Sequence, residues 1–172
     1  MFDKMLRVDH SGELGADRIY CGQMYALRLK NPEKAAIVQK LWDQEKEHYR
    51  EFNYLILKHR ARRSLLTPIW NVSAFMLGYM PSLLGYEAAM ATSVAVEKVI
   101  TDHYNEQIRE LIADDMKENN ELIASLSRIR DDEQEHHDTG LAHDAERAPL
   151  YKYFSFVVET ITKTAVKVAQ KI

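Results

Sequence analysis

Two Glu-x-x-His motifs in closely similar settings constrain the fold of this chain more than any other feature. One spans Glu45 to His48 and the other spans Glu133 to His136, and each ends a segment that reads Asp-x-Glu-x-Glu-His. A lone glutamate precedes each motif, Glu13 in the first half and Glu97 in the second. A single Glu-x-x-His arises by chance in many proteins, but repetition of the whole pattern indicates two related structural units.

The apolar residues of both units follow helical spacing. They recur at intervals of three and four residues, and Asn31-Pro32 interrupts the first unit where proline suits the first turn of a new helix. The sequence predicts helices over about 5–29, 32–60, 87–112 and 117–141.

The spacing also predicts which residues face each other. Two antiparallel helices joined by a short loop bring residues equidistant from the loop to one level, because both rise ~1.5 Å per residue. Leu29, beside the first helix break, is the midpoint between Glu13 and Glu45. Asp115 is the corresponding midpoint in the second unit. In each helical hairpin, the lone glutamate is therefore expected to face the Glu-x-x-His motif.

These charged residues continue the apolar stripes of their helices, so the pattern places them in the core. Burying ionised groups without compensation costs several kcal/mol each, and like charges at one level also repel. Two divalent cations would balance four carboxylates, and oxygen-rich ligation with one imidazole per metal suits iron or manganese. A lone Glu from two helices and Glu-x-x-His from two others is the ligand set of ferritin-like di-iron proteins. The predicted metal ligands are Glu13, Glu45, His48, Glu97, Glu133 and His136.

The surroundings of this predicted site are less determined. Tyr104 lies two turns beyond Glu97 on the same helix face, where it would either approach the metals or the substrate or act as a core residue. A histidine ligand usually donates its other N–H to a partner. Asp43 and Asp131 are candidates for that role, but their angle to the motif leaves the partner open.

A stretch without charged residues connects the two hairpins, from Ser64 to Tyr86. Pro68 and Pro81 are expected to bracket its helical part, which is shorter than the ~20 apolar residues of a membrane span. A buried core helix and a helix in the membrane interface both fit this composition. The basic amphipathic helix expected over 150–172 likewise fits either a membrane surface or packing on its own domain.

The composition supports one all-α domain over the 172 residues. Its parts are hairpin 1 at about 5–61, the apolar crossover at about 64–86, hairpin 2 at about 87–145 and the C-terminal helix. A net charge of −3 gives no electrostatic footprint for nucleic acid, and Cys21, the single cysteine, excludes a multi-thiolate metal site.

Several longer segments resemble the demethoxyubiquinone hydroxylase family over nearly the whole chain. They include Val8 to Glu13, Trp42 to His48, His103 to Asn105 and Asp131 to Asp138. Ser11 stands where the family usually has alanine, and all six predicted metal positions match.

This resemblance implies a di-iron monooxygenase that hydroxylates the ring of a polyprenylated demethoxy benzoquinone during ubiquinone biosynthesis. It implies two iron ions per chain, O2, and two electrons from NADH directly or through a carrier. It also implies peripheral attachment to a membrane: the matrix side of the mitochondrial inner membrane in a eukaryote, or the cytoplasmic face of the inner membrane in a bacterium. A lipid-binding accessory protein of the biosynthetic complex is expected in a eukaryote, and a homo-oligomer is left open.

Two other classes of function fit the same residues. One is a ferritin-like iron-storage or manganese-catalase protein, which would have little use for the uncharged segment. The other is a metal-free or iron-binding structural adaptor of a membrane biosynthetic complex.

Overall fold

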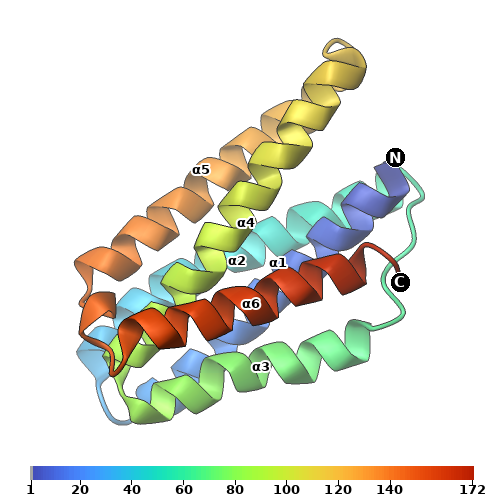
Figure 1. Ribbon diagram of the computed structural model, residues 1–172. Helices are drawn as coiled ribbons and strands as arrows, with labels where there is room; N and C mark the ends of the chain where they lie inside the picture. The colour runs from blue at the N-terminus through green and yellow to red at the C-terminus, as the bar shows by residue number, and fades with distance from the viewer. Residues whose placement is uncertain (1) are drawn as a thin grey trace.

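The computed structural model describes residues 2–172, which form an all-helical, ferritin-like bundle without a strand in that range (Figure 1). The elements are α1 (Phe2–Leu27), α2 (Pro32–Lys58), α3 (Thr67–Leu84), α4 (Tyr86–Asp115), α5 (Asn120–Ala142), the 3₁₀ turn η1 (Ala145–Arg147) and α6 (Tyr151–Ala169).

Helices α1 and α2 form one hairpin, and α4 and α5 form the other, as the spacing predicted. Asn31 caps α2 by accepting a hydrogen bond from the backbone N–H of Lys34, and Pro32 occupies the first helical position. Across the first hairpin, Trp42 Nε1 donates to Asp17 Oδ1 at 2.7 Å. The turn that joins α4 to α5 projects beyond the ends of α1 and α2 in Figure 1, and Lys58 at the end of α2 pairs with Glu121 just after the turn.

Helix α3 extends beyond the limits that the prolines predicted. Pro81 lies inside the helix, which continues to Leu84, so the expectation that this proline ends the helical part is wrong. A proline inside a helix removes one N–H, and here it stands near the C-terminal end, where one lost hydrogen bond affects only the last turn. The chain then turns at Gly85, whose φ of 139° is accessible to glycine but rarely to other residues.

Two glycines bring α3 and α1 into backbone contact. A Cβ atom on Gly78 would stand 2.0 Å from the carbonyl oxygen of Ile19, and one on Gly22 would stand 2.3 Å from the carbonyl oxygen of Phe75. The crossover helix is therefore fixed to α1 at a distance that only glycine permits.

The apolar core lies in two main clusters that flank the middle of the bundle. One cluster is near the hairpin 1 turn and includes Leu27, Val38 and Met90. The other lies toward the opposite end and includes Leu6 and Phe52. The predicted ligands fall between them along α1, α2 and α4, so apolar side chains separate the site from solvent at both ends.

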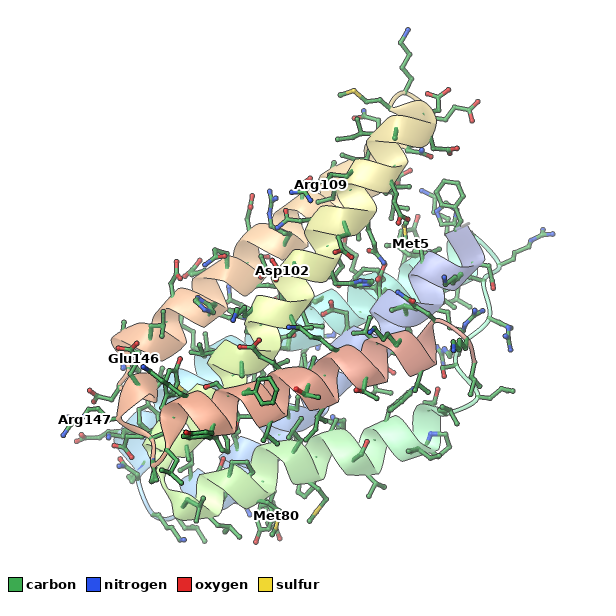
Figure 2. All side chains as sticks on the ribbon, viewed as in Figure 1. Met5, Met80, Asp102, Arg109, Glu146 and Arg147 are labelled. Atoms are coloured by element: carbon green, nitrogen blue, oxygen red, sulfur yellow. The ribbon has the colours of Figure 1, made fainter. Side chains whose placement is uncertain are left out.

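Helices α3 and α6 keep an exposed apolar side. On α3, only Gly78 and Ser82 are buried, whereas Met80 is 53% exposed and projects away from the bundle (Figure 2). On α6, Val158 is buried while Phe156 is 69% exposed. Each helix therefore packs on the bundle with one side and presents apolar residues outward with the other. Among residues 2–172, no helix combines the length and hydropathy needed to cross a membrane.

Candidate metal centre

The structure brings all six predicted ligands together in the centre of the bundle, and each is at most 1% exposed. They form two groups whose ligand atoms lie within 4.8 Å of one another. Each lone glutamate lies in the group that holds the Glu-x-x-His histidine of its own hairpin. The groups share two glutamates: the first contains Glu13, Glu45, His48 and Glu133, and the second contains Glu45, Glu97, Glu133 and His136.

Both histidines turn Nδ1 toward the carboxylates. His48 Nδ1 lies 3.2 Å from Glu133 Oε1 and 3.7 Å from Glu13 Oε2. His136 Nδ1 lies 2.8 Å from Glu45 Oε1 and 3.5 Å from Glu133 Oε2. The two rings stack with centroids 6.0 Å apart. One nitrogen of each ring is therefore directed into the middle of the cluster.

The atoms directed into this space make no hydrogen bond of good geometry, although several lie close to an oppositely charged group. They include both side-chain oxygens of Glu45 and at least one oxygen of each other glutamate, together with both Nδ1 atoms. Buried polar atoms without partners are rare in native proteins, and a cation is one group that satisfies several at once. Six buried oxygen and nitrogen donors in two overlapping groups fit two divalent metal ions of the iron or manganese type.

Burial and mutual repulsion govern protonation of the metal-free cluster. Burial, followed by the charge of Glu133, raises the pKa of Glu13 and Glu97 well above the ordinary value. Burial alone would lower the pKa of both histidines, but contacts with the carboxylates raise it to about 12 for His48 and about 11 for His136. Burial would raise the pKa of Glu133, but contacts with the two histidines hold it well below its ordinary range. Without metal, protons bound to these side chains offset the negative charge of the carboxylates, which two cations would otherwise neutralise.

We expect the metal-free chain to lose stability as the pH rises. The raised pKa values mean that His48 and His136 take up protons on folding. The stability that these protonated histidines contribute is complete below their unfolded pKa of 6.5. It is lost as the pH rises toward their folded pKa values. Each retained proton lowers the free energy of unfolding by up to about 1.4 kcal/mol per pH unit in that window. The melting temperature in excess chelator should therefore fall as the pH rises above about 6.5 toward these folded values.

Metal-loaded protein is the control for this pH dependence. Bound cations would replace the protons, so its melting temperature should follow a shallower slope. The same slope for the loaded and the chelated protein would contradict the assignment of the protons to this cluster.

The outer nitrogens of the two histidines contact residues that the sequence analysis missed. His48 Nε2 lies 3.0 Å from Asp132 Oδ2, and His136 Nε2 lies 3.3 Å from Gln44 Oε1. Asp43 and Asp131, the candidates considered for this role, instead bind a neighbouring lysine and arginine at the surface. Their positions in the sequence could have identified these partners, because each one immediately precedes the glutamate of a Glu-x-x-His motif.

Tyr104 lies against the cluster and contacts the opposite hairpin. Its hydroxyl donates to Glu13 Oε1, and it is 1% exposed. Tyr20, its counterpart in the other half, donates to Glu97 Oε1 at 2.9 Å. Each tyrosine thus fixes one oxygen of the lone glutamate that the other hairpin supplies.

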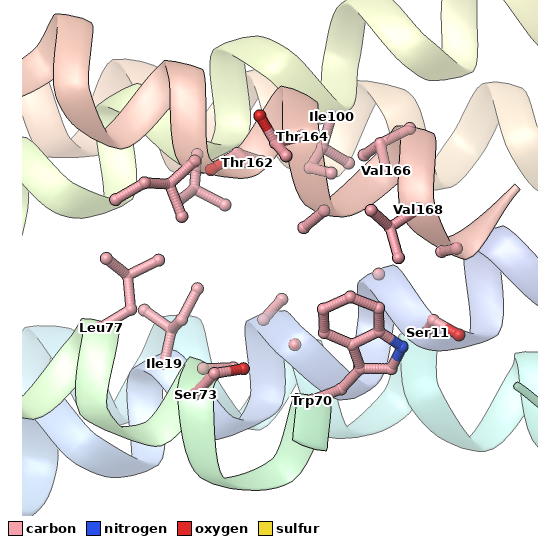
Figure 3. Close-up of a pocket in the computed structure, with 18 of the residues that line it drawn as sticks. Ser11, Ile19, Trp70, Ser73, Leu77, Ile100, Thr162, Thr164, Val166 and Val168 are labelled. Carbon is pink, nitrogen blue, oxygen red and sulfur yellow. The ribbon is translucent and has the colours of Figure 1, made fainter. Parts of the chain in front are cut away.

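An apolar cavity of about 490 Å³ lies on the outer side of α1 and α4, between α3 and α6 (Figure 3). Ile19, Leu77 and Ile100 line it, and Trp70 and Val168 lie on facing helices. On α1, the wall contains Gly12 and Gly15, where an added Cβ would meet nothing within 4 Å. Gly12 and Val96 directly precede the two lone glutamates, so the cavity runs along the helices that carry them.

The chain is similar to proteins of ubiquinone biosynthesis over nearly its whole length. The family model described as "Ubiquinone biosynthesis protein COQ7" matches residues 1–169. The chain is 44% identical over 172 residues to the NADPH-dependent 3-demethoxyubiquinone 3-hydroxylase of Caenorhabditis elegans, covering all of this chain and 91% of that protein. It is 45% identical over 170 residues to the human mitochondrial protein of the same name, covering 99% of this chain and 77% of the human one.

A bacterial relative extends the comparison. The 3-demethoxyubiquinol 3-hydroxylase of Rhodospirillum rubrum is 36% identical over 172 residues, covering all of this chain and 79% of that protein. A family match over almost the whole sequence, with relatives of this identity and coverage, shows that the chain belongs to the COQ7 family of ubiquinone biosynthesis proteins.

Proposed function

We propose that this chain is a monooxygenase that hydroxylates the ring of a polyprenylated demethoxy benzoquinone or quinol in ubiquinone biosynthesis. The observation that carries the proposal is the pair of overlapping donor groups, buried beside an apolar cavity of quinone size. The printed names of the relatives, which describe hydroxylases of demethoxyubiquinone or demethoxyubiquinol, support the same reaction.

Two iron ions are the proposed metals. Glu13 and His48 would hold one, Glu97 and His136 the other, and the two shared glutamates would bridge them. When bound, such a centre supplies reduction of O2 by two electrons, with one oxygen atom entering the ring and the other leaving as water.

The chain's own residues position and shield this chemistry. Tyr20 and Tyr104 each hold one oxygen of a lone glutamate, which fixes how its other oxygen faces the cluster. Asp132 and Gln44 orient the imidazoles through Nε2. The flanking apolar clusters exclude water from the site, which strengthens electrostatic interactions within it.

The cavity would bind the substrate ring and the first part of its prenyl tail. Its lining is mainly apolar, as a site for a lipid-soluble ligand requires. The glycines on α1 let a planar ring approach the backbone of the helix that carries Glu13. The rest of the tail would leave between α3 and α6, whose outer sides expose apolar residues.

Those outer sides also support peripheral attachment to a membrane. On α3, one exposed stripe contains Ile69, Val72, Met76, Met80 and Leu83 at helical spacing, and α6 adds Tyr153, Phe156 and Val157. A helix with one apolar face can lie in the membrane interface without crossing it. We propose this attachment at the matrix side of the inner membrane in a mitochondrion, or at the cytoplasmic face in a bacterium, with a lipid-binding accessory protein as a partner where the source is eukaryotic.

The electrons are proposed to come from a reduced nicotinamide dinucleotide, directly or through a carrier. The resemblance implies NADH, whereas the names of several relatives specify NADPH. Parallel reactions with each dinucleotide would identify the donor for this chain.

The decisive experiment supplies ¹⁸O₂ to the iron-loaded chain with a short-prenyl demethoxyquinone and a nicotinamide reductant. The expected product carries one ¹⁸O atom on the ring, detected by mass spectrometry, at a metal content of about two irons per chain. Iron uptake without a ring product would favour storage, and rapid peroxide breakdown by a manganese-loaded chain would favour a catalase. A chain that binds no metal would favour the structural adaptor.

Filling the cavity should separate substrate binding from metal binding. Gly15→Leu places a branched side chain in the open space next to α1, so kcat/KM should fall at least about tenfold, or ~1.4 kcal/mol. Metal content should stay unchanged, since no ligand atom is altered. Gly15→Ala is the matched control, because one methyl group leaves most of the cavity open. An unchanged kcat/KM in Gly15→Leu would show that the substrate does not use this cavity.

A further inference from the structure

The two halves of the centre repeat each other closely, and one pair of residues breaks the repeat. Each half holds a lone glutamate, a histidine and a tyrosine hydroxyl donated from the other hairpin. Both halves share the same two bridging candidates. Behind the histidines, however, one half has the carboxylate of Asp132 and the other has the amide of Gln44.

The two outer contacts have the same geometry relative to their imidazole rings. In each, an oxygen atom faces Nε2 of the ring, at 3.0 Å for Asp132 and 3.3 Å for Gln44. Either oxygen can accept the Nε2–H, which leaves the lone pair on Nδ1 for a cation. The contacts also cross between hairpins, because Asp132 on α5 supports His48 on α2, and Gln44 on α2 supports His136 on α5.

The two contacts differ in charge. A hydrogen bond to a carboxylate is roughly twice as strong as one to a neutral acceptor, and it makes the imidazole a better electron donor to a metal. Arg128 offsets part of the charge on Asp132, at 3.2 Å from the same Oδ2. That arginine is 52% exposed and also pairs with Glu51, so solvent screens its effect. Gln44 carries no charge to offset.

We propose that Asp132 makes the Glu13–His48 half the tighter of two metal positions, so that this half fills before the Glu97–His136 half. The inference rests on the two-metal site proposed above and adds an order of loading to it. Asp132 and Gln44 act through the histidines and are positioning residues, not ligands.

Cobalt(II) titration of the metal-free chain tests this order without relying on activity. Under anaerobic conditions with a competing chelator, visible absorption should rise in two steps. Exchange of an outer hydrogen-bond partner changes metal affinity by about 10- to 100-fold, so the steps should differ by at least about tenfold. Asp132→Asn should weaken the tighter step by about that factor, and Gln44→Asp should strengthen the weaker step.

The exchanged double variant Q44D/D132N should restore two steps with the order of the halves reversed. Glu97→Gln identifies the halves, because it removes a ligand from the His136 half only. In the wild-type background, Glu97→Gln should keep the tighter step, and in the exchanged background it should keep the weaker one. Asp131→Asn is the matched control, since Asp131 adjoins Asp132 but binds only the surface residue Arg130. Circular dichroism of each metal-free variant verifies the fold.

Equal affinities in the wild type, or an equal loss at both steps in Asp132→Asn, would overturn the proposed order while leaving the two-metal site intact. A wild-type chain that binds no cobalt would instead overturn the two-metal site on which the order depends.

Discussion

Replacing Glu133 with alanine is expected to remove both metal ions and to lower the hydroxylase activity at least about a thousandfold. Glu133 belongs to both donor groups and contacts both histidines, so its loss takes a ligand from each position at once. Glu13 belongs to one group only. Glu13→Ala should therefore leave one ion per chain, and metal analysis after desalting would distinguish one ion from none.

Glu135→Ala is the matched control for this loss. Glu135 lies in the same motif, but its side chain is exposed and belongs to neither group. This variant should keep both ions and wild-type activity. Two ions retained in Glu133→Ala, or equal losses in Glu133→Ala and Glu135→Ala, would contradict the bridging role proposed for Glu133.

The other large effect is expected at the contact between α1 and α3. Gly78→Ala should lower the free energy of unfolding by about 3 kcal/mol and the melting temperature by ~6–12 °C. The added Cβ would lie 2.0 Å from a backbone oxygen of Ile19, which has no rotamer by which to move away. Helix α3 must then shift, and because α3 lines the cavity, substrate binding should weaken as well.

Gly12→Ala provides the comparison for Gly78→Ala. Both are helical glycines, but a Cβ on Gly12 meets no atom within 4 Å, so only the helix-favouring effect of alanine remains. Its melting temperature should equal or exceed that of the wild type, as thermal unfolding of both variants would show. A Gly78→Ala variant with wild-type stability would mean that α3 is not held to α1 at this crossing.

The hairpins and the gathering of the six charged residues could be predicted because both depend on spacing alone. Equal rise in two antiparallel helices fixes which residues share a level, whatever the side chains are. The stripes then decide which faces are buried. These two regularities located Glu13 opposite Glu45 without any knowledge of how the hairpins pack together.

Contacts between hairpins could not be predicted in this way. The partners of the histidines, Gln44 and Asp132, and the exchange of Tyr20 and Tyr104 depend on how α2 meets α5 and how α1 meets α4. No spacing within a hairpin determines those relations. The predicted end of α3 was wrong because proline was assumed to end the helix. Pro81 lies close to the C-terminal end of α3, where its missing N–H disturbs only the last turn.

The exchange of tyrosines also has a consequence for symmetry. Each hairpin donates a hydroxyl to the other's lone glutamate and receives one in return, and the contacts behind the histidines cross between hairpins in the same reciprocal way. Such a surface is self-complementary under a twofold axis, as in an isologous dimer. Two identical copies of one such hairpin could thus assemble a complete centre. The present chain carries two such hairpins in tandem, so equivalent positions can hold different residues, as Asp132 and Gln44 do.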